Sequence, residues 1–263
     1  MRTFAQGLGS EILVELRVYL QNKAAVVSDF LSYFLLYAFL TLFKTGTSLP
    51  GAYGAPQEYG PLLLFMGYIL WMLCSRALVS VSSQILSEAD RGFLFVKLTS
   101  VFPVQLLYFA RLVTAVFIIL LFVVPMFVVL SLVSTVPVLS ALQIIRAASV
   151  GLIGLCGMYG IGLLLASLTM ANKRLSNLSM LFSTVLLLTS NALTYSEDIH
   201  NVLAWFPANY CIHNVRMIVS AKDFFPQDFV LMASLCAALV AAGAIVFEFS
   251  IRKARKAGNI LWY

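Results

Sequence analysis

Six stretches of about twenty or more mostly apolar residues run through this chain of 263 residues, and no other feature restricts its folding as strongly. They cover residues 24–43, 61–83, 104–134, 144–170, 175–194 and 229–250. A helix needs about 20 such residues to cross a bilayer. Because 61% of the residues are hydrophobic and only 11% are charged, the charges are too few to coat a water-soluble globule. We therefore expect an all-α integral membrane protein with six transmembrane helices.

The segment before the first apolar stretch has a different pattern. Between residues 8 and 22, leucine, isoleucine and tyrosine side chains fall on one side of a helical projection, and Glu11, Glu15 and Arg17 fall on the other. This pattern predicts an amphipathic helix that lies along the membrane surface, and the alternative is a partly ordered tail. The expected organisation is a cytoplasmic interfacial helix at 1–23, a six-span domain at 24–250 and a basic cytoplasmic tail at 251–263.

Lysines and arginines are distributed unevenly between the segments that join the apolar stretches. If the N-terminus is cytoplasmic, only Lys44, Arg146, Arg216 and Lys222, out of 17 such residues, fall on the opposite side. Positive residues collect in cytoplasmic loops, so we expect a multi-pass protein of the plasma membrane with both termini in the cytoplasm. The same bias explains the net charge of +6 without a nucleic-acid partner.

Motifs for catalysis and metal binding are missing from the sequence. It contains no GxxxxGK[ST] loop for ATP phosphates, no HExxH, no GxSxG and no CxxC. Glu197, Asp198 and His200 could together bind a metal ion, but a solvated loop explains them better. We expect no enzyme activity, no bound cofactor and no metal in this chain. Aromatic and apolar residues at helical spacing after the fifth stretch predict short outer helices there.

The fifth stretch carries polar residues with a period of seven, which is close to two helical turns. Its polar pairs are Ser176, Asn177, Ser183, Thr184, Ser190 and Asn191. We expect them to form one narrow stripe along the whole helix that faces protein or water, because lipid cannot satisfy amide groups. Packing between helices and a wet substrate pathway explain this stripe equally well.

The first two stretches hold further candidate residues. Tyr33 and Tyr37 share one helical face, where they either contact lipid or stack on an amphipathic substrate. Arg76 lies deep in the second stretch. It pairs with Asp29 or Glu88 or faces a cytoplasmic vestibule, and the sequence leaves these alternatives open.

The segment after the second stretch, SEADRGFLFVKLTSVFP, resembles the coupling segment of ABC-2-type transporter permeases. The positions that carry this resemblance are Glu88, Gly92, Leu98, Ser100 and Pro103. The later sequence AWFPANYCIHNVR is similar to the Pro–aromatic–Arg stretch of that family, through Pro207, Tyr210 and Arg216. The likeness covers almost the whole chain.

The resemblance implies a permease that exports drugs, peptides, lipids or glycan precursors. It implies a dimer of permeases, either two copies or two paralogues, driven by separately encoded ATPase subunits that bind ATP and Mg²⁺. The first, second and fifth spans would line the subunit seam, so the polar stripe, Tyr33 and Tyr37 become the expected substrate pathway. The expected ATPase-docking segment is a short cytoplasmic helix containing Glu88, Asp90, Arg91, Gly92, Phe93, Leu94 and Phe95.

A secondary carrier or channel that uses no ATP is the alternative function. Such a protein needs an ionisable residue within the membrane as part of its pathway, and Arg76 and Asp29 are the candidates. Elimination favours the permease, because the chain has a long cytoplasmic segment for a partner but neither an ATP site nor a charge relay of its own.

Overall fold

The computed structural model describes residues 2–43, 46–94, 104–134, 137, 139–172, 175–220, 222 and 226–257. Within these residues the fold is all-helical and contains no strand. The longer helices are α1 (Arg2–Gln21), α2 (Lys23–Leu42), α4 (Gly60–Asp90), α6 (Val104–Val133), α7 (Ala141–Ala171), α8 (Ser176–Thr189), α10 (Pro207–Val219) and α11 (Pro226–Ala257). Shorter helical turns are α3 (Leu49–Tyr53), η1 (Gln57–Tyr59) and α9 (Glu197–Leu203).

Five helices in the described part of the chain are long and apolar enough to cross a membrane. They are α2, α4 together with η1, α6, α7 and α11. Each coincides with one of the predicted apolar stretches, because a long run of apolar residues in lipid can satisfy its backbone only within a helix. The predicted all-helical membrane class is therefore confirmed at this level.

The fifth apolar stretch, predicted as a span at 175–194, forms a shorter helix than expected. Helix α8 contains 14 residues and is capped at Ser190, and Asn191 then takes a left-handed backbone conformation with φ 55°. At 1.5 Å per residue, 14 residues extend about 21 Å, less than the roughly 30 Å of a hydrocarbon core. By length, the described residues therefore hold five spans rather than six, with α8 as an additional short apolar helix.

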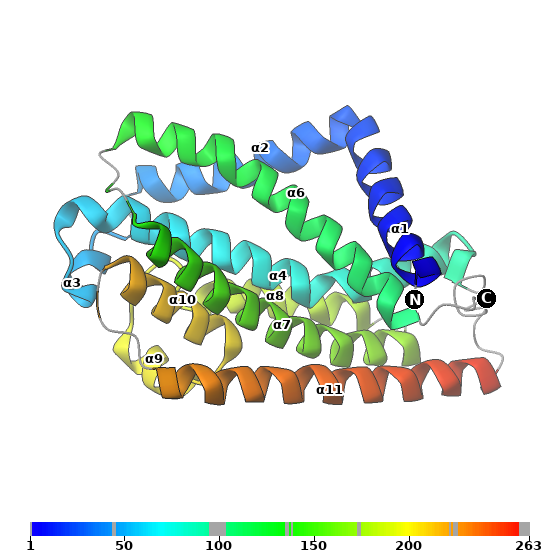
Figure 1. Ribbon diagram of the computed structural model, residues 1–263. Coiled ribbons are helices and arrows are strands. Elements are labelled where there is room, and N and C mark those ends of the chain that lie inside the picture. Colours follow the sequence, from blue (N-terminus) through cyan, green and yellow to red (C-terminus); the bar gives the residue numbers. More distant parts are fainter. Residues whose placement is uncertain are drawn as a thin grey trace.

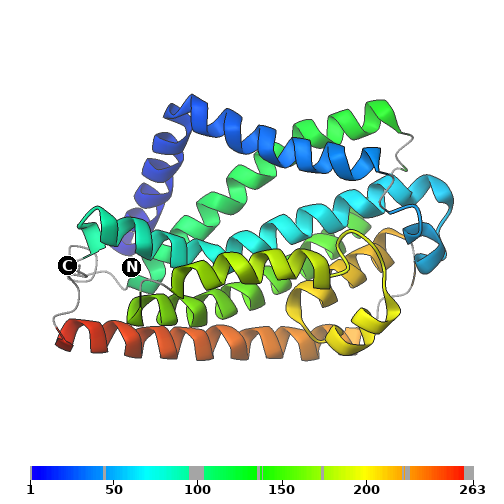
Figure 2. The same ribbon diagram turned by 180° about the vertical axis from the view of Figure 1, so that it is seen from behind.

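The helices form a bundle with two distinct ends (Figure 1). The start of α1, the C-terminal ends of α4 and α11, and the start of α6 lie at one end, which we call the terminal end. Helices α3 and α9 lie at the opposite, distal end. Helix α8 runs beside α4 over much of the bundle, and α2 and α6 cross each other on the other side of α4 (Figure 2).

Helix α7 is the centre of the bundle and packs against α4, α10 and α11. Its glycines permit this. A Cβ on Gly160 would lie 2.6 Å from the backbone of Leu239 in α11, and one on Gly162 would lie 2.6 Å from the carbonyl oxygen of Ala77 in α4. Small residues allow helix backbones to approach this closely in membrane proteins. The glycine-rich stretch therefore serves helix packing.

The two flanking segments differ in part from their predicted form. Residues 2–21 form the expected N-terminal helix, which packs along α6. Helix α11 continues through Arg252 and Lys253 to Ala257, so the first half of the predicted basic tail extends a long helix. Residues 258–263 lie outside the described residues. The predicted short helices after the fifth stretch are present as α9 and α10.

Candidate functional site

A cavity of about 370 Å³ lies between α2, α4 and α8. Its lining combines three predicted pathway residues with side chains of α4. They are Tyr33, Asn177 and Ser183 from the predicted set, together with Trp71, Met72, Ser75, Arg76, Val79, Ser83, Leu86, Ser179 and Met180. Three segments far apart in the sequence, α2, α4 and α8, thus contribute to one cavity.

Arg76 is the charged residue of this cavity, and the structure selects its partner. Its Nε donates to the Tyr33 hydroxyl at 2.9 Å, and its guanidinium carbon lies 5.8 Å from the centre of the Tyr33 ring. Its Nη2 lies 3.9 Å from Asp29 Oδ2, which also accepts a hydrogen bond of 2.8 Å from the Tyr19 hydroxyl. Arg76 therefore pairs with Asp29 and not with Glu88, one of the alternatives that the sequence left open.

This ion pair lies partly exposed at the surface of the chain. The side chains of Arg76 and Asp29 are 43% and 39% exposed. Exposed pairs of this kind contribute only about 0–1 kcal/mol to stability. Both partners therefore remain available to a polar group of a bound molecule, at little cost to the fold.

The polar groups of the cavity sit among apolar ones. The hydroxyls of Ser75 in α4 and Ser183 in α8 share a hydrogen bond of 2.9 Å, and the Asn177 side chain is exposed. Met72 and Met180 supply flexible apolar surface between them. The cavity can therefore accommodate a molecule with both apolar and polar parts.

Ser190 and Asn191 of the predicted stripe do not line this cavity, because helix α8 ends at Thr189. Thr184 is exposed, and its hydroxyl donates to the Met180 carbonyl oxygen at 3.1 Å. Ser190 and Asn191 are buried beyond the helix end, where the Asn191 amide bonds both backbone groups of Ser196. The expectation of one stripe along the whole span was wrong. The side chain of Ser176 lies outside the description, and Tyr37 lines a different cavity.

The sequence did not reveal what holds this turn in place. Arg216 in α10 is fully buried and donates to three backbone carbonyl oxygens: Leu63 at 3.0 Å, Asn191 at 2.6 Å and Ala192 at 2.5 Å. Gly67 makes room for it, because a Cβ there would lie 2.2 Å from Arg216 Nη2. Only the resemblance singled out this arginine, and no local pattern indicates its partners.

The predicted docking segment is described as far as Leu94. Helix α4 ends at Asp90, Gly92 has a positive φ of 74°, and helical backbone resumes at Phe93. Asp90 and Arg91 are exposed, and Phe93 is 60% exposed. Phe95 and residues 96–103 lie outside the described residues.

Two members of this set face the interior of the chain. Leu94 is 2% exposed. Glu88 is 6% exposed and accepts hydrogen bonds from Arg111 Nη1 at 2.5 Å and from the Tyr108 hydroxyl at 3.0 Å. Within the predicted set, the described side chains exposed for contact with a partner are therefore those of Asp90, Arg91 and Phe93.

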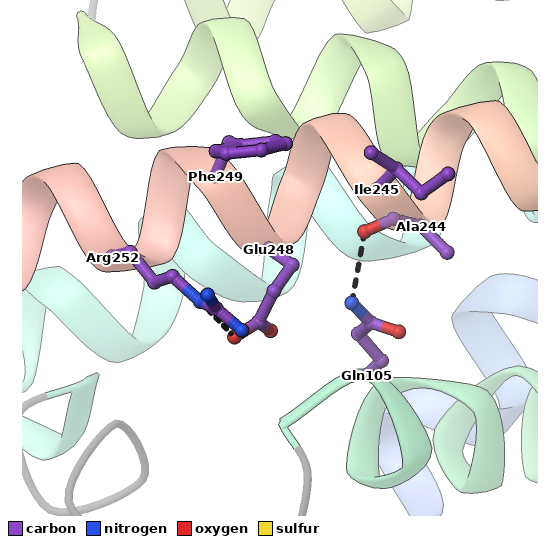
Figure 3. A pocket seen from close by; sticks show the side chains of 6 residues that line it. All are labelled: Gln105, Ala244, Ile245, Glu248, Phe249 and Arg252. Atoms are coloured by element: carbon purple, nitrogen blue, oxygen red, sulfur yellow. Dashed lines mark hydrogen bonds and ion pairs between the residues drawn. The ribbon is translucent and has the colours of Figure 1, made fainter.

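A further cavity of about 340 Å³ lies between the start of α6 and the last part of α11 (Figure 3). Gln105 Nε2 donates to the Ala244 carbonyl oxygen at 2.9 Å, and Arg252 bonds Glu248 at 3.0 Å one turn away on the same helix. Phe249 lies on the neighbouring face of α11 (Figure 3). None of the predicted pathway residues lines this cavity.

Among the described residues, no three His, Cys, Asp or Glu side chains lie together in an arrangement that could hold a metal ion. His200 instead stacks on His213, with ring centres 4.1 Å apart. A scan against protein-family models gives no match to this chain, and a search of curated proteins gives no relative.

Proposed function

We propose that the chain is the permease subunit of an ATP-driven exporter of the ABC-2 type, which forms its substrate pathway as a dimer and borrows energy from separate ATPase subunits. In this arrangement α8 serves as a short sixth span, α1 lies in the membrane interface, and the terminal end faces the cytoplasm. The strongest support is the cavity between α2, α4 and α8, because these are the helices for which the resemblance implies a place at the subunit seam.

The surface of α8 supports a second copy at this seam. Met180, Leu181 and Leu188 are 71%, 58% and 69% exposed, and the polar Asn177 and Thr184 lie among the exposed residues of the same helix. Lipid satisfies the apolar side chains but not the Asn177 amide. A facing copy of α8 would give Asn177 a polar partner and close the open side of the cavity.

Energy coupling would pass through the turn after α4. Exposed aromatic residues anchor many protein interfaces, and truncation of one such anchor costs about 2 kcal/mol or more. Phe93 has this character, with Asp90 and Arg91 beside it as polar contacts. The internal positions of Glu88 and Leu94 give them a different role, which is to hold this turn against α6 and the bundle.

Co-purification with an ATPase followed by hydrolysis assays tests the proposal. We expect a separate ATPase subunit to co-purify with this chain. Its rate of ATP hydrolysis should rise when the transported substrate is added. Asn177→Leu and Ser183→Val should reduce that stimulation, whereas Ser234→Val, which alters an exposed hydroxyl on α11, should not. Phe93→Ala should release the ATPase while the permease still inserts. Full stimulation in the Asn177 and Ser183 variants would contradict the assigned pathway.

The secondary carrier or channel remains the second candidate, and the Arg76–Asp29 pair favours it. An accessible ion pair inside a helical bundle is a common element of ion-coupled pathways. If no ATPase co-purifies, and Arg76→Gln or Asp29→Asn abolishes flux driven by an ion gradient, this second function replaces the first.

A further inference from the structure

A second and larger cavity, of about 580 Å³, lies at the distal end of α2 and α6. Its deep wall contains Leu64 and Leu130, which are 2% and 5% exposed. Its mouth is formed by Leu42 and Val133, which are 79% and 81% exposed. The cavity therefore opens between the last residues of α2 and α6, two of the helices that are apolar enough to cross a membrane.

The chemistry of the lining changes along the cavity. From Leu42 to Phe34, over about 12 Å of helix α2, most of the lining is apolar, and the Thr41 hydroxyl bonds its own helix. The exception is Tyr37, whose buried hydroxyl has no hydrogen-bond partner among the described residues. Side chains with exposed polar groups, Thr47 and Gln57, come from the segment at the distal end that precedes α4. No charged side chain is among the residues that line the cavity. The cavity is thus apolar where it is deep and polar where the helices end.

We propose that this cavity binds one acyl chain of a bilayer glycerolipid, with the ester and glycerol region at Thr47 and Gln57. The volume lies within the roughly 300–1,000 Å³ of small-molecule sites. Water is a poor occupant, because an ordered water needs two to four polar partners and the deep wall supplies apolar side chains. A lipid tail entering between Leu42 and Val133 buries apolar surface on both sides and leaves its polar region at the level of the helix ends.

This site is independent of the proposed exporter function. It uses the end of α2, α6, the segment before α4 and the first residues of α4, whereas the cavity of the proposed pathway uses Tyr33 of α2, the middle of α4 and α8. The lipid would fill the space between the end of α2 and the start of α4, where the two helix backbones lie apart. An occupied cavity therefore ties α2 to the rest of the bundle in either a permease or a carrier.

Photocrosslinking in vesicles tests the proposal. The purified full chain is reconstituted in phosphatidylcholine containing a trace of phosphatidylcholine with a diazirine in one acyl chain, irradiated and digested for mass spectrometry. We expect cross-links on the wall formed by Pro61 and Leu64, in addition to those on outward-facing positions. Leu64 is buried, so a lipid reaches it only by entering the cavity.

Paired tryptophan substitutions separate entry into the cavity from ordinary lipid contact. Ala38→Trp fills the cavity and should reduce labelling of the Leu64 wall about tenfold, since several methylene groups lose their site. Leu35→Trp, on the same helix but outside the lining and already 55% exposed, should leave that labelling unchanged. Val133→Trp at the exposed mouth repeats the test if the Ala38 variant does not fold.

Three results would overturn the proposal. The first is a wild-type protein labelled only at outward-facing positions. The second is labelling of the Leu64 wall that persists at full level in both Ala38→Trp and Val133→Trp. The third is a disulfide between two copies carrying Leu42→Cys that forms in the vesicles and abolishes the labelling, because a second subunit would then cover the mouth.

Discussion

Two arginines near opposite ends of the bundle, one partly buried and one fully buried, are bound by different kinds of group. Arg111, near the terminal end, bonds carboxylates from two other helices: Glu88 of α4 at 2.5 Å and Glu15 of α1 at 2.6 Å, with Glu11 at 3.9 Å. Arg216, toward the distal end, is fully buried and donates to three backbone carbonyl oxygens, with the Tyr53 ring 5.8 Å away.

The difference separates two ways of joining helices. At the terminal end, opposite charges from separate helices hold α1, α4 and α6 together, so the joint depends on the side chains of each partner. At the distal end, one guanidinium satisfies carbonyl groups that no helix satisfies, because Asn191 and Ala192 follow the end of α8. Apolar side chains can replace the ion pairs at the terminal end. They cannot replace the hydrogen bonds of Arg216 at the distal end, because the backbone carbonyl groups remain after any substitution.

Removal of the distal arginine should have the largest effect. Arg216→Met leaves the carbonyl oxygens of Asn191 and Ala192 buried without a donor, at about 1–3 kcal/mol for each group. We expect the free energy of unfolding to fall by about 4 kcal/mol, measured by thermal unfolding of the purified protein in detergent. Arg146→Met, which alters an exposed arginine of α7, is the control. Equal stability of the two variants would show that other groups satisfy the turn.

Removal of the terminal-end arginine should be costly but recoverable. Arg111→Met removes the guanidinium that bonds the buried Glu88 carboxylate, and breaking such a pair costs about 3 kcal/mol. The double variant Arg111→Met/Glu88→Leu should recover much of this loss, since apolar replacements of buried ion pairs are often neutral. Guanidinium or thermal unfolding of both variants measures the difference. A double variant no more stable than the single one would show that apolar side chains cannot replace the ion pair at the terminal end.

A methyl group beside Arg216 should have an intermediate effect. Gly67→Ala places a Cβ 2.2 Å from Arg216 Nη2 and 2.6 Å from the Ala192 carbonyl oxygen, so both must move. We expect the free energy of unfolding to fall by about 2 kcal/mol, which is in the range for overpacked cores. Gly151→Ala, whose Cβ meets only the Leu70 side chain at 3.2 Å, should reduce stability less. Comparison of the melting temperatures of the two variants tests this expectation.

The free energy of unfolding should also depend weakly on pH, because His213 at the distal end titrates differently in the folded and unfolded chain. Burial, followed by His200, Arg216 and Lys222, lowers the pKa of His213 from 6.5 to about 4. Because the folded protein binds this proton less well than the unfolded chain, the contribution to stability is complete above pH 6.5, declines as the pH falls toward 4, and does not change further below that. We expect about 1 kcal/mol to be lost by pH 5, after allowance for partial exposure.

A matched variant isolates this effect. His213→Gln keeps a polar side chain near the Tyr53 hydroxyl, which lies 3.3 Å from His213 Nδ1. Its unfolding temperature should fall less between pH 7 and pH 5 than that of the wild type. Parallel curves for the two proteins would assign the pH dependence to other groups, such as His200 with Glu197.

The sequence alone determined where the long helices run. The stretches 24–43 and 229–250 became helices at Lys23–Leu42 and Pro226–Ala257, since an apolar run of this length has only one way to satisfy its backbone in lipid. It also singled out Tyr33, Asn177 and Ser183, which do line one cavity.

Only the tertiary structure decided where the polar residues of these helices point and where the fifth helix stops. Periodicity extended the polar stripe to Asn191, but the chain leaves the helix before it, and Arg216, 25 residues later, bonds the released carbonyl group. Likewise, the sequence places Glu88 in a cytoplasmic segment. In the structure it is buried and bonds Arg111, which lies 23 residues later. Partners so far apart leave no local pattern, because the energy that fixes each one comes from a group on another helix.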